Sequence, residues 1–454
     1  MKSVPDIQRE YFNQNHTKPV EFRIQQLKKL RELLKTEEKL LYDAVYTDFR
    51  KSGFDTYLTE FAVPINELDT AISHLKRWAK IKKVRTDMVN FPGSSYIIPE
   101  PLGVCLIIGA WNYPINLTLT PLISAMAAGN TVVLKPSELT AHTSAALARL
   151  INNHFDPAYL TVVEGGIVET TALLENKFDR IFFTGSASVG KIVYQAAARQ
   201  MTPVTLELGG KSPAIIEKDA NLNMAVRRLV WAKFLNAGQT CIAPDYILVH
   251  RSVEKELLEK LKLEIQQSNF SLANGNYVQI INEKNLDRLR GLIDQDKIFF
   301  GGQTDKEQRS MSPTVLSNIL PTDKIMTEEI FGPVLPVMAY DDLDSAIEFI
   351  KSKSKPLSLY LFTNSVDVRE KILSEISFGG GAVNDAVMHF SNSRLPFGGV
   401  GLSGIGSYHG KAGFDTFTHY KSVFQKPNWF ELNFKYFPHT KKKLKLIKFI
   451  MSLK

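Results

Sequence analysis

The chain has 454 residues, of which 44% are hydrophobic and 22% charged, and this composition excludes disordered and fibrous proteins. The length predicts two or three domains. Two cysteines are too few for a disulfide framework or a four-cysteine zinc site, so we predict no metal. Because the sequence shows neither an apolar run of ~18 residues nor a signal-peptide core near its start, we expect a cytoplasmic protein that does not span a membrane.

The net charge of +8 is concentrated near the C-terminus. Residues 441–454 contain six lysines and no acidic residue, which leaves +2 for the rest of the chain. A basic nucleic-acid-binding surface on the body of the protein is therefore not indicated.

The N-terminal part of the chain predicts two helices followed by a hairpin. Apolar residues recur with a period near 3.6 over residues 21–49 and again over residues 58–78, where Pro64 marks a first turn or a kink. Residues 84–101 contain Pro92-Gly93 between two apolar runs. This pattern predicts a hairpin that leaves the main body and pairs elsewhere.

From residue 102 to 206, short apolar runs alternate with helical stretches. The runs are Val104–Ile108, Thr131–Leu134, Leu160–Val163, Ile181–Phe183 and Val204–Leu206. Runs this short suit strands buried on both faces, and the alternation predicts a doubly wound α/β domain with a parallel sheet. A second α/β region begins near residue 208, with strands at 214–216 and 246–249 and a helix over 252–268.

Two familiar nucleotide-binding patterns fail on their context. Gly399–Gly404 fits G-x-G-x-x-G, but it follows no strand and precedes no amphipathic helix, so we interpret it as a glycine-rich surface loop. Gly185–Lys191 fits the first seven positions of a phosphate-binding loop. The next residue is Ile192, where Ser or Thr is needed as a magnesium ligand, and this counts against an ATPase or GTPase.

The segment 185–191 is still informative because it follows a predicted strand and opens a predicted helix. Gly185 and Gly190, with the N–H groups near Ser186, suit the pyrophosphate of a dinucleotide. The same glycines suit a plain strand–helix turn that packs tightly. The residues alone leave both interpretations open.

The two cysteines differ in their surroundings. Cys105 lies inside a predicted buried strand and is interpreted as a small core residue. Cys241 follows the polar, glycine-containing segment 236–240, which is typical of the position of a nucleophile. A cysteine protease would also need a histidine beside the thiol, and the sequence does not mark His389 or His409 for that role.

Two further polar residues follow predicted parallel strands. Glu207 ends a strand and precedes two glycines, a better position for chemistry than the solvated surface that most glutamates occupy. Asn112 follows the strand and glycine at 104–109, and its amide suits a hydrogen bond to a developing oxyanion. Neither residue is decisive alone.

Taken together, seven motifs occur in one order. They are Ala110–Pro114, Ala128–Asn130 with Leu134–Glu138, Phe183–Ser186, Leu206–Pro213, Gly238–Cys241, Glu328–Pro333 and Leu395–Gly399. From Phe22 to about Lys421 the chain resembles the aldehyde dehydrogenase superfamily, and within it the class 3 branch that includes fatty aldehyde dehydrogenases. The resemblance implies an aldehyde dehydrogenase-like α/β fold with a Rossmann-type cofactor domain, an α/β catalytic domain and a bridging hairpin.

The same resemblance implies a domain plan. It assigns 1–83 and 102–207 to the dinucleotide-binding domain, 208–391 to the catalytic domain, 84–101 and 392–425 to bridging elements, and 426–454 to a basic amphipathic tail. The first predicted helix begins too early in the chain for the longer N-terminal arm of tetrameric relatives, so a homodimer is expected, with the hairpin pairing across it.

For catalysis, the resemblance implies that Cys241 attacks an aldehyde carbonyl and forms a thiohemiacetal, then a thioester. The Asn112 side chain and the Cys241 backbone N–H would hold the oxyanion. Glu207 would activate the water that releases the carboxylic acid, and would also help to deprotonate the thiol. The expected substrate is an apolar aliphatic or aromatic aldehyde.

For the cofactor, NAD or NADP, the resemblance implies a set of contacts. Glu329 would hold the nicotinamide ribose and Phe331 would pack beside the ring. Lys135 and Glu138 would contact the adenosine ribose, and Trp111 would lie near the pyrophosphate held by Gly185, Ser186 and Gly190. Glu138 should repel a 2′-phosphate and so favour NAD, although class 3 relatives often accept both.

Several alternatives stay open at this point. CoA-acylating relatives commonly lack the general base, so Glu207 favours hydrolysis over acyl transfer, and esterase activity is compatible with the same site. A catalytically silent binding protein is countered by the intact Asn112, Glu207 and Cys241. The tail at 441–451 mixes lysines with apolar residues, which suits reversible attachment to an anionic membrane surface or a helix packed on a partner subunit or over the substrate funnel.

Overall fold

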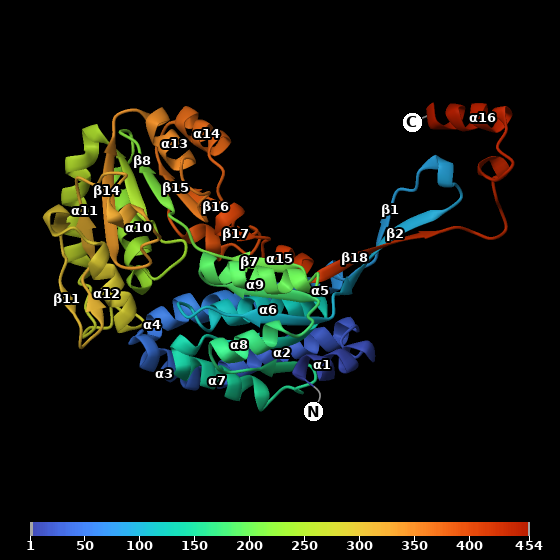
Figure 1. Ribbon diagram of the computed structural model, residues 1–454, viewed down its shortest axis with the longest axis horizontal. Helices are drawn as coiled ribbons and strands as arrows, with labels where there is room; N and C mark the ends of the chain where they lie inside the picture. Colours follow the sequence, from blue (N-terminus) through green and yellow to red (C-terminus); the bar gives the residue numbers. More distant parts are fainter. Residues whose placement is uncertain (1–2, 453–454) are drawn as a thin grey trace.

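The computed structural model describes residues 3–452, which fold around two large sheets and a projecting arm (Figure 1). The first large sheet has the strand order β17-β7-β6-β3-β4-β5. Its strands are β3 (Val104–Ile108), β4 (Thr131–Lys135), β5 (Leu160–Val162), β6 (Arg180–Thr184), β7 (Val204–Glu207) and β17 (Gly404–Ile405). All pairs among β3 to β7 are parallel, as predicted from the short buried runs.

Helices cover both faces of this sheet. They are α1 (Val4–Asn13), α2 (Val20–Thr36), α3 (Glu38–Phe49), α4 (Gly53–Thr56), a π-helical turn η1 (Tyr57–Phe61), α5 (Ala62–Trp78), α6 (Asn116–Ala128), η3 (Glu138–Thr140), α7 (Ala141–Asn152), α8 (Ile167–Leu174) and α9 (Ala187–Arg199). The helix predicted over residues 21–49 is in fact two helices that meet at Glu37, whose backbone leaves helical geometry. Pro64 lies in the first turn of α5, as predicted.

The second large sheet has the order β10-β13-β14-β9-β8-β15-β16. Its strands are β8 (Pro213–Ile216), β9 (Tyr246–His250), β10 (Ile298–Phe300), β13 (Thr314–Leu316), β14 (Val334–Tyr340), β15 (Ser358–Phe362) and β16 (Gly380–Val383). The helices of this lobe are α10 (Leu222–Phe234), α11 (Glu254–Ser268), α12 (Glu283–Leu292), α13 (Leu343–Lys351) and α14 (Val366–Glu375). Helix α15 (Gly410–Thr416) comes later in the chain and packs on α5 and α6 of the first lobe. Smaller elements are β11 (Thr304–Asp305), β12 (Ser310–Met311) and the 3₁₀ turns η4 (Leu235–Gly238), η5 (Arg251–Val253), η6 (Gln295–Lys297), η7 (Lys324–Met326), η8 (Met388–Ser391) and η9 (Gly401–Ser403).

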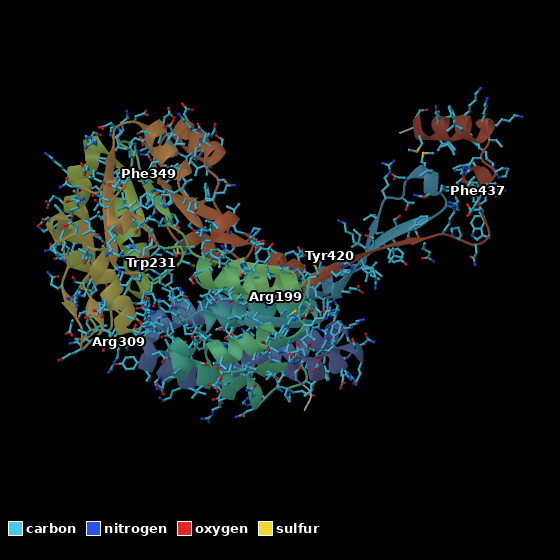
Figure 2. All side chains as sticks on the ribbon, in the orientation of Figure 1. Arg199, Trp231, Arg309, Phe349, Tyr420 and Phe437 are labelled. Atoms are coloured by element: carbon cyan, nitrogen blue, oxygen red, sulfur yellow. The ribbon has the colours of Figure 1, made fainter. Side chains whose placement is uncertain are left out.

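The predicted hairpin is confirmed and forms the projecting arm. Strands β1 (Lys82–Val84) and β2 (Ser94–Pro101) pair antiparallel, and β18 (Thr418–Gln425) pairs with the whole length of β2. In Figure 1 these strands leave the body, and α16 (Lys441–Ser452) lies at the far end near η2 (Met88–Asn90). A further 3₁₀ turn, η10 (Asn433–Lys435), precedes α16. Figure 2 labels Tyr420 where the arm begins and Phe437 near its tip.

The glycine-rich segment 399–404 is not the surface loop that we expected. Gly404 pairs with Glu207 in an antiparallel ladder, so β17 becomes the edge strand of the first sheet. The carbonyl of the buried Ser403 also accepts a hydrogen bond from the Leu208 backbone at 3.2 Å. This segment therefore fixes the end of β7, where Glu207 lies, a long-range pairing that local sequence context cannot show.

Among residues 3–452, no helix has both the length and the hydropathy needed to cross a bilayer.

Candidate active site

Cys241 follows a backbone turn in an unusual conformation. After α10, both Asn236 and Ala237 have left-handed φ angles, 54° and 51°. Such angles cost on the order of 1–3 kcal/mol each and persist only where the surroundings fix them. Gly238 (φ 71°) is required for a second reason, because a Cβ there would lie 2.3 Å from the Gly332 carbonyl oxygen. The loop before Cys241 is therefore held in one shape by tertiary contacts.

Buried side-chain amides supply those contacts and bring Asn112 to the loop. The Gln239 side chain donates to the carbonyls of Asn236 (3.1 Å) and Gln279 (3.0 Å). The Asn236 side chain donates to the Asn112 carbonyl at 2.9 Å. The Asn112 side chain in turn donates to the Gln239 carbonyl at 3.1 Å, which leaves its second amide hydrogen available. Asn112 is thus joined by hydrogen bonds to the loop that precedes Cys241.

Cys241 and Glu207 line the same cavity of about 150 Å³, between the two large sheets. Most of its other lining residues are apolar: Leu58, Val63, Leu117, Leu208, Trp231, Leu235, Ile242, Leu357, Val387, Met388, Phe390 and Phe397. Figure 2 labels Trp231, which also lines a neighbouring cavity of about 620 Å³. An apolar pocket lined at one place by a thiol and at another by a carboxylate suits a small reactive group carried on an apolar body.

Three polar groups at this cavity have no hydrogen-bond partner among the described residues. They are both carboxylate oxygens of Glu207, the Thr184 hydroxyl and the Tyr408 hydroxyl. Buried polar atoms are usually paired, so unpaired ones that line a cavity suit a substrate or a water with several polar partners.

Burial changes the acid–base behaviour of the two central groups. It raises the pKa of Glu207 well above the ordinary value for a glutamate. Burial also raises the pKa of the Cys241 thiol, and the Glu329 and Glu207 carboxylates add to that effect. Hydrogen bonds from the Cys241 and Ile242 backbone oppose the rise but do not reverse it. The thiol therefore needs a base, and Glu207 is a stronger base than a solvated glutamate.

Glu329 and Phe331 are the residues expected at the nicotinamide end, and Trp111 is expected near the pyrophosphate. Trp111 and Phe331 contact each other edge to face, with ring centroids 5.2 Å apart. The Glu329 carboxylate lies against the backbone of Gly209, where a Cβ would be 1.9 Å from its oxygen. Burial and the nearby Asp245 raise the pKa of Glu329 to about 8, against a hydrogen bond from the Gly210 backbone.

The residues expected at the adenosine and pyrophosphate end are split between buried and exposed positions. The Lys135 ammonium is buried, donates to the Pro136 carbonyl at 2.7 Å and lies 3.8 Å from the exposed Glu138 carboxylate. Ser186 is the exposed N-cap of α9 and accepts from the Val189 backbone at 3.4 Å.

The glycines at 185 and 190 have a packing role that the sequence left open. A Cβ at Gly185 would lie 2.6 Å from the Phe183 ring, and one at Gly190 would lie 2.6 Å from the Leu208 side chain. Gly190 therefore allows α9 to approach the sheet closely. A contact of these backbones with phosphate stays a prediction.

The histidines weighed for a cysteine protease lie in an aromatic cluster. His389 and His409 pack on the Phe397 ring, and burial lowers their pKa values to about 4 and about 3. Among the described residues, neither histidine is hydrogen-bonded to Cys241. The structure gives no support to a Cys–His pair.

Comparisons with known proteins now bear on the site. Residues 4–423 match the model of the aldehyde dehydrogenase family. The chain belongs to the aldehyde dehydrogenase family. The class 3 resemblance is confirmed as well, because relatives over more than nine-tenths of the chain include members named aldehyde dehydrogenase family 3.

Two curated proteins and one solved structure illustrate the similarity. A 4,4'-diaponeurosporen-aldehyde dehydrogenase of Staphylococcus aureus is 47% identical over 96% of both chains. The dimeric NADP-preferring aldehyde dehydrogenase of Rattus norvegicus is 46% identical over 92% of this chain and 93% of its own. A solved structure of Staphylococcus aureus AldH in a substrate-bound state has a TM-score of 0.97 at 46% identity, covering 99% of this chain and 100% of that one. These comparisons confirm the fold class and identify this chain as an aldehyde dehydrogenase, an enzyme of aldehyde oxidation.

Proposed function

We propose that this aldehyde dehydrogenase oxidises an apolar aldehyde, aliphatic or aromatic, to the carboxylic acid with NAD or NADP. The observation that carries the proposal is the mostly apolar cavity that Cys241 and Glu207 line, where neither Glu207 oxygen has a hydrogen-bond partner among residues 3–452. The mostly apolar lining supplies contacts for the body of the substrate, and Cys241 and Glu207 supply the reactive polar groups.

In the proposed mechanism, the Cys241 thiolate adds to the aldehyde carbonyl and forms a thiohemiacetal. The free amide hydrogen of Asn112 and the Cys241 backbone N–H donate to the oxyanion. When bound, the nicotinamide cofactor supplies the hydride acceptor. After oxidation the thioester remains on Cys241, and Glu207 takes a proton from the water that attacks it.

The proposed cofactor site follows the edge of the first sheet from β4 to α9. Ser186 and the exposed start of α9 would place backbone N–H groups and the positive end of the helix dipole at the pyrophosphate. Lys135 and Glu138 would hold the adenosine ribose, and Glu329 the nicotinamide ribose. Phe331 would pack beside the nicotinamide ring, and Trp111 would lie near the pyrophosphate. Exposed apolar side chains at Ile167 and Val168, at the start of α8, suit the adenine ring.

The two nicotinamide cofactors, NAD and NADP, are both kept in the proposal. The Glu138 carboxylate is about half exposed and should repel a 2′-phosphate, which favours NAD. The buried Lys135 ammonium, 3.8 Å away, partly offsets that charge, and the rat relative is named NADP-preferring.

Hydrolysis is proposed in place of transfer to coenzyme A. Glu207 is present, buried and unpaired beside the thiol, as a general base for water requires. A CoA-acylating enzyme would instead show product formation that depends on added CoA.

The proposal is tested by following absorbance at 340 nm with NAD or NADP and a panel of aldehydes from short aliphatic to long-chain and aromatic. We expect kcat/KM to rise with the apolar size of the aldehyde, because each added methylene buried in the pocket contributes about 0.8 kcal/mol. A preference for short polar aldehydes would contradict the apolar substrate, and no reduction with any aldehyde would contradict the activity. Adding CoA tests the acyl-transfer alternative.

A homodimer in which the arm contacts the partner is part of the proposal. The arm sheet β1-β2-β18 projects from the body, and the rat relative is named dimeric. The domain plan proposed above, with bridging elements at 84–101 and 392–425, places this sheet between subunits.

The arm also carries the excess positive charge of the chain. Residues 82–101 and 418–454 contain twelve Lys and Arg against three Asp and Glu. The remaining residues contain 43 Lys and Arg against 44 Asp and Glu. In α16, Leu444, Leu446, Phe449 and Met451 are exposed beside the lysines. We therefore include reversible attachment of a cytoplasmic enzyme to an anionic membrane surface, at about 1 kcal/mol per lysine near the lipid.

Deleting residues 441–454 should abolish co-sedimentation with vesicles that contain anionic phospholipid. The full chain should bind such vesicles, release them at high salt because the attraction is screened, and leave phosphatidylcholine vesicles unbound. The deletion should not change dehydrogenase activity on a soluble aldehyde. Equal vesicle binding by the two proteins would contradict the proposal.

A further inference from the structure

A buried ion pair lies outside the residues assigned to catalysis. The Lys51 ammonium donates to Glu60 Oε1 at 2.8 Å, and both side chains are almost fully buried, with 1% and 0% exposed. Buried ion pairs often contribute little net stability, because desolvation offsets the attraction between the charges. We therefore looked for what this pair holds in place.

The second oxygen of Glu60 reaches the segment that follows Asn112. Glu60 Oε2 accepts hydrogen bonds from the backbone N–H groups of Ile115 and Asn116, each at 3.1 Å, where α6 begins. The Asn116 side chain donates in the opposite direction, to the Thr59 carbonyl at 3.1 Å. Thr59 and Glu60 lie in the π-helical turn η1, a geometry often found at functional sites. This turn therefore fixes the backbone just after Asn112.

Lys51 connects the same pair to the nucleophile loop. Its ammonium lies 4.7 Å from the centroid of the Tyr113 ring. The Tyr113 hydroxyl and the Thr240 hydroxyl are hydrogen-bonded at 2.5 Å, and Thr240 directly precedes Cys241. Tyr113, Asn116 and Thr240 all line the same cavity as Cys241.

We infer that Lys51 and Glu60 are positioning residues that fix the Asn112 amide relative to the Cys241 thiol. Glu60 acts through its hydrogen bonds to the backbone that follows Asn112. Lys51 acts through its contact with the Tyr113 ring, whose hydroxyl is hydrogen-bonded to Thr240, the residue before Cys241. Donors to an oxyanion act only when they are held at the right distance, and a misplacement of about 1 Å can cost about 100-fold in rate. This inference rests on the proposed oxyanion role of Asn112.

The test removes both charges together, with Lys51→Met and Glu60→Gln, so that no buried charge is left unpaired. The matched control is Arg9→Gln with Asp179→Asn. That pair is 2.8 Å apart, and Asp179 also accepts a backbone N–H, from Val104 at the opposite end of β3 from Asn112. We expect the first double variant to lose about 10- to 100-fold in kcat with an unchanged KM for the nicotinamide cofactor, and the control to stay within about twofold.

Repeating the double substitution in an Asn112→Ala enzyme distinguishes a positioning role of Lys51 and Glu60 from a general structural defect. Asn112→Ala alone should lower kcat by about 10²–10³-fold. In that background the Lys51→Met/Glu60→Gln change should cost less than about threefold, because its effect acts through Asn112. The same loss in both backgrounds, or full activity of the folded double variant, would overturn the inference. Full activity of Asn112→Ala would instead overturn the oxyanion role on which it rests.

If circular dichroism shows that the double variant does not fold, Tyr113→Phe replaces it in the same two backgrounds. This variant removes only the hydroxyl that contacts Thr240. We expect Tyr113→Phe to lower kcat when Asn112 is intact, and to have little further effect on kcat in the Asn112→Ala variant. Unchanged kcat in Tyr113→Phe would then overturn the inference.

Discussion

Cys241→Ser should abolish NAD(P)-dependent aldehyde oxidation, with a loss of at least about 10³-fold in kcat. A serine hydroxyl in the same position is a far poorer nucleophile than a thiolate, and nucleophile replacements in covalent catalysis cost several orders of magnitude. The measurement is the rate of absorbance increase at 340 nm with saturating aldehyde. Cofactor affinity, measured by protein fluorescence, should stay near the unmutated value, because Trp111 and Phe331 are untouched.

The other free thiol provides the matched control for this experiment. Cys105 is fully buried in β3, and its replacement by alanine should leave turnover near normal with a small loss of stability. Substantial turnover in Cys241→Ser would remove Cys241 from the role of nucleophile. Loss of activity in Cys105→Ala but not in Cys241→Ser would reverse the assignment.

Glu207→Gln should slow thioester hydrolysis by about 10²–10⁴-fold, the range expected for a lost general base. The glutamine has nearly the same shape, so the cavity should remain, but its amide cannot take a proton from water. An acyl-enzyme should therefore accumulate, visible as an added mass on the protein after reaction with aldehyde and cofactor. Full steady-state turnover would contradict the role.

Glu217→Gln is the control for this change. Glu217 is also buried and also lies at the carboxyl end of a parallel strand, β8, but its carboxylate accepts a hydrogen bond from the Tyr340 hydroxyl at 2.7 Å. It lies outside the set of residues that line the cavity. We expect its activity to remain within about threefold of the unmutated enzyme.

The Glu207→Gln variant should also change the dependence of thioester hydrolysis on pH. Only the ionised carboxylate can accept a proton, so hydrolysis in the unmutated enzyme should rise as pH rises through the pKa of Glu207. Burial raises that pKa well above the ordinary value, so the rise should occur at higher pH than for a solvated glutamate. In Glu207→Gln this rise should be absent from the hydrolysis step measured on preformed acyl-enzyme.

The sequence by itself determined the α/β class and most of the strands. Runs such as Val104–Ile108 are short and apolar throughout because both faces of a parallel strand are covered, and this signal is local. The hairpin could be predicted for a similar reason, since Pro92-Gly93 interrupts two apolar runs. The family motifs carried the candidate roles of Asn112, Glu207 and Cys241, which lie far apart in the chain.

Only the tertiary structure decided how these residues meet. The sequence pattern did not reveal the break at Glu37 or the π-helical turn η1. The pairing of Gly404 with Glu207 joins residues almost 200 positions apart. The left-handed turn before Cys241 is stabilised by hydrogen bonds from buried side-chain amides to partners on other elements. Lys51 and Glu60 belong to no sequence motif. Their role was inferred from their burial and hydrogen bonds, which a local sequence pattern does not show.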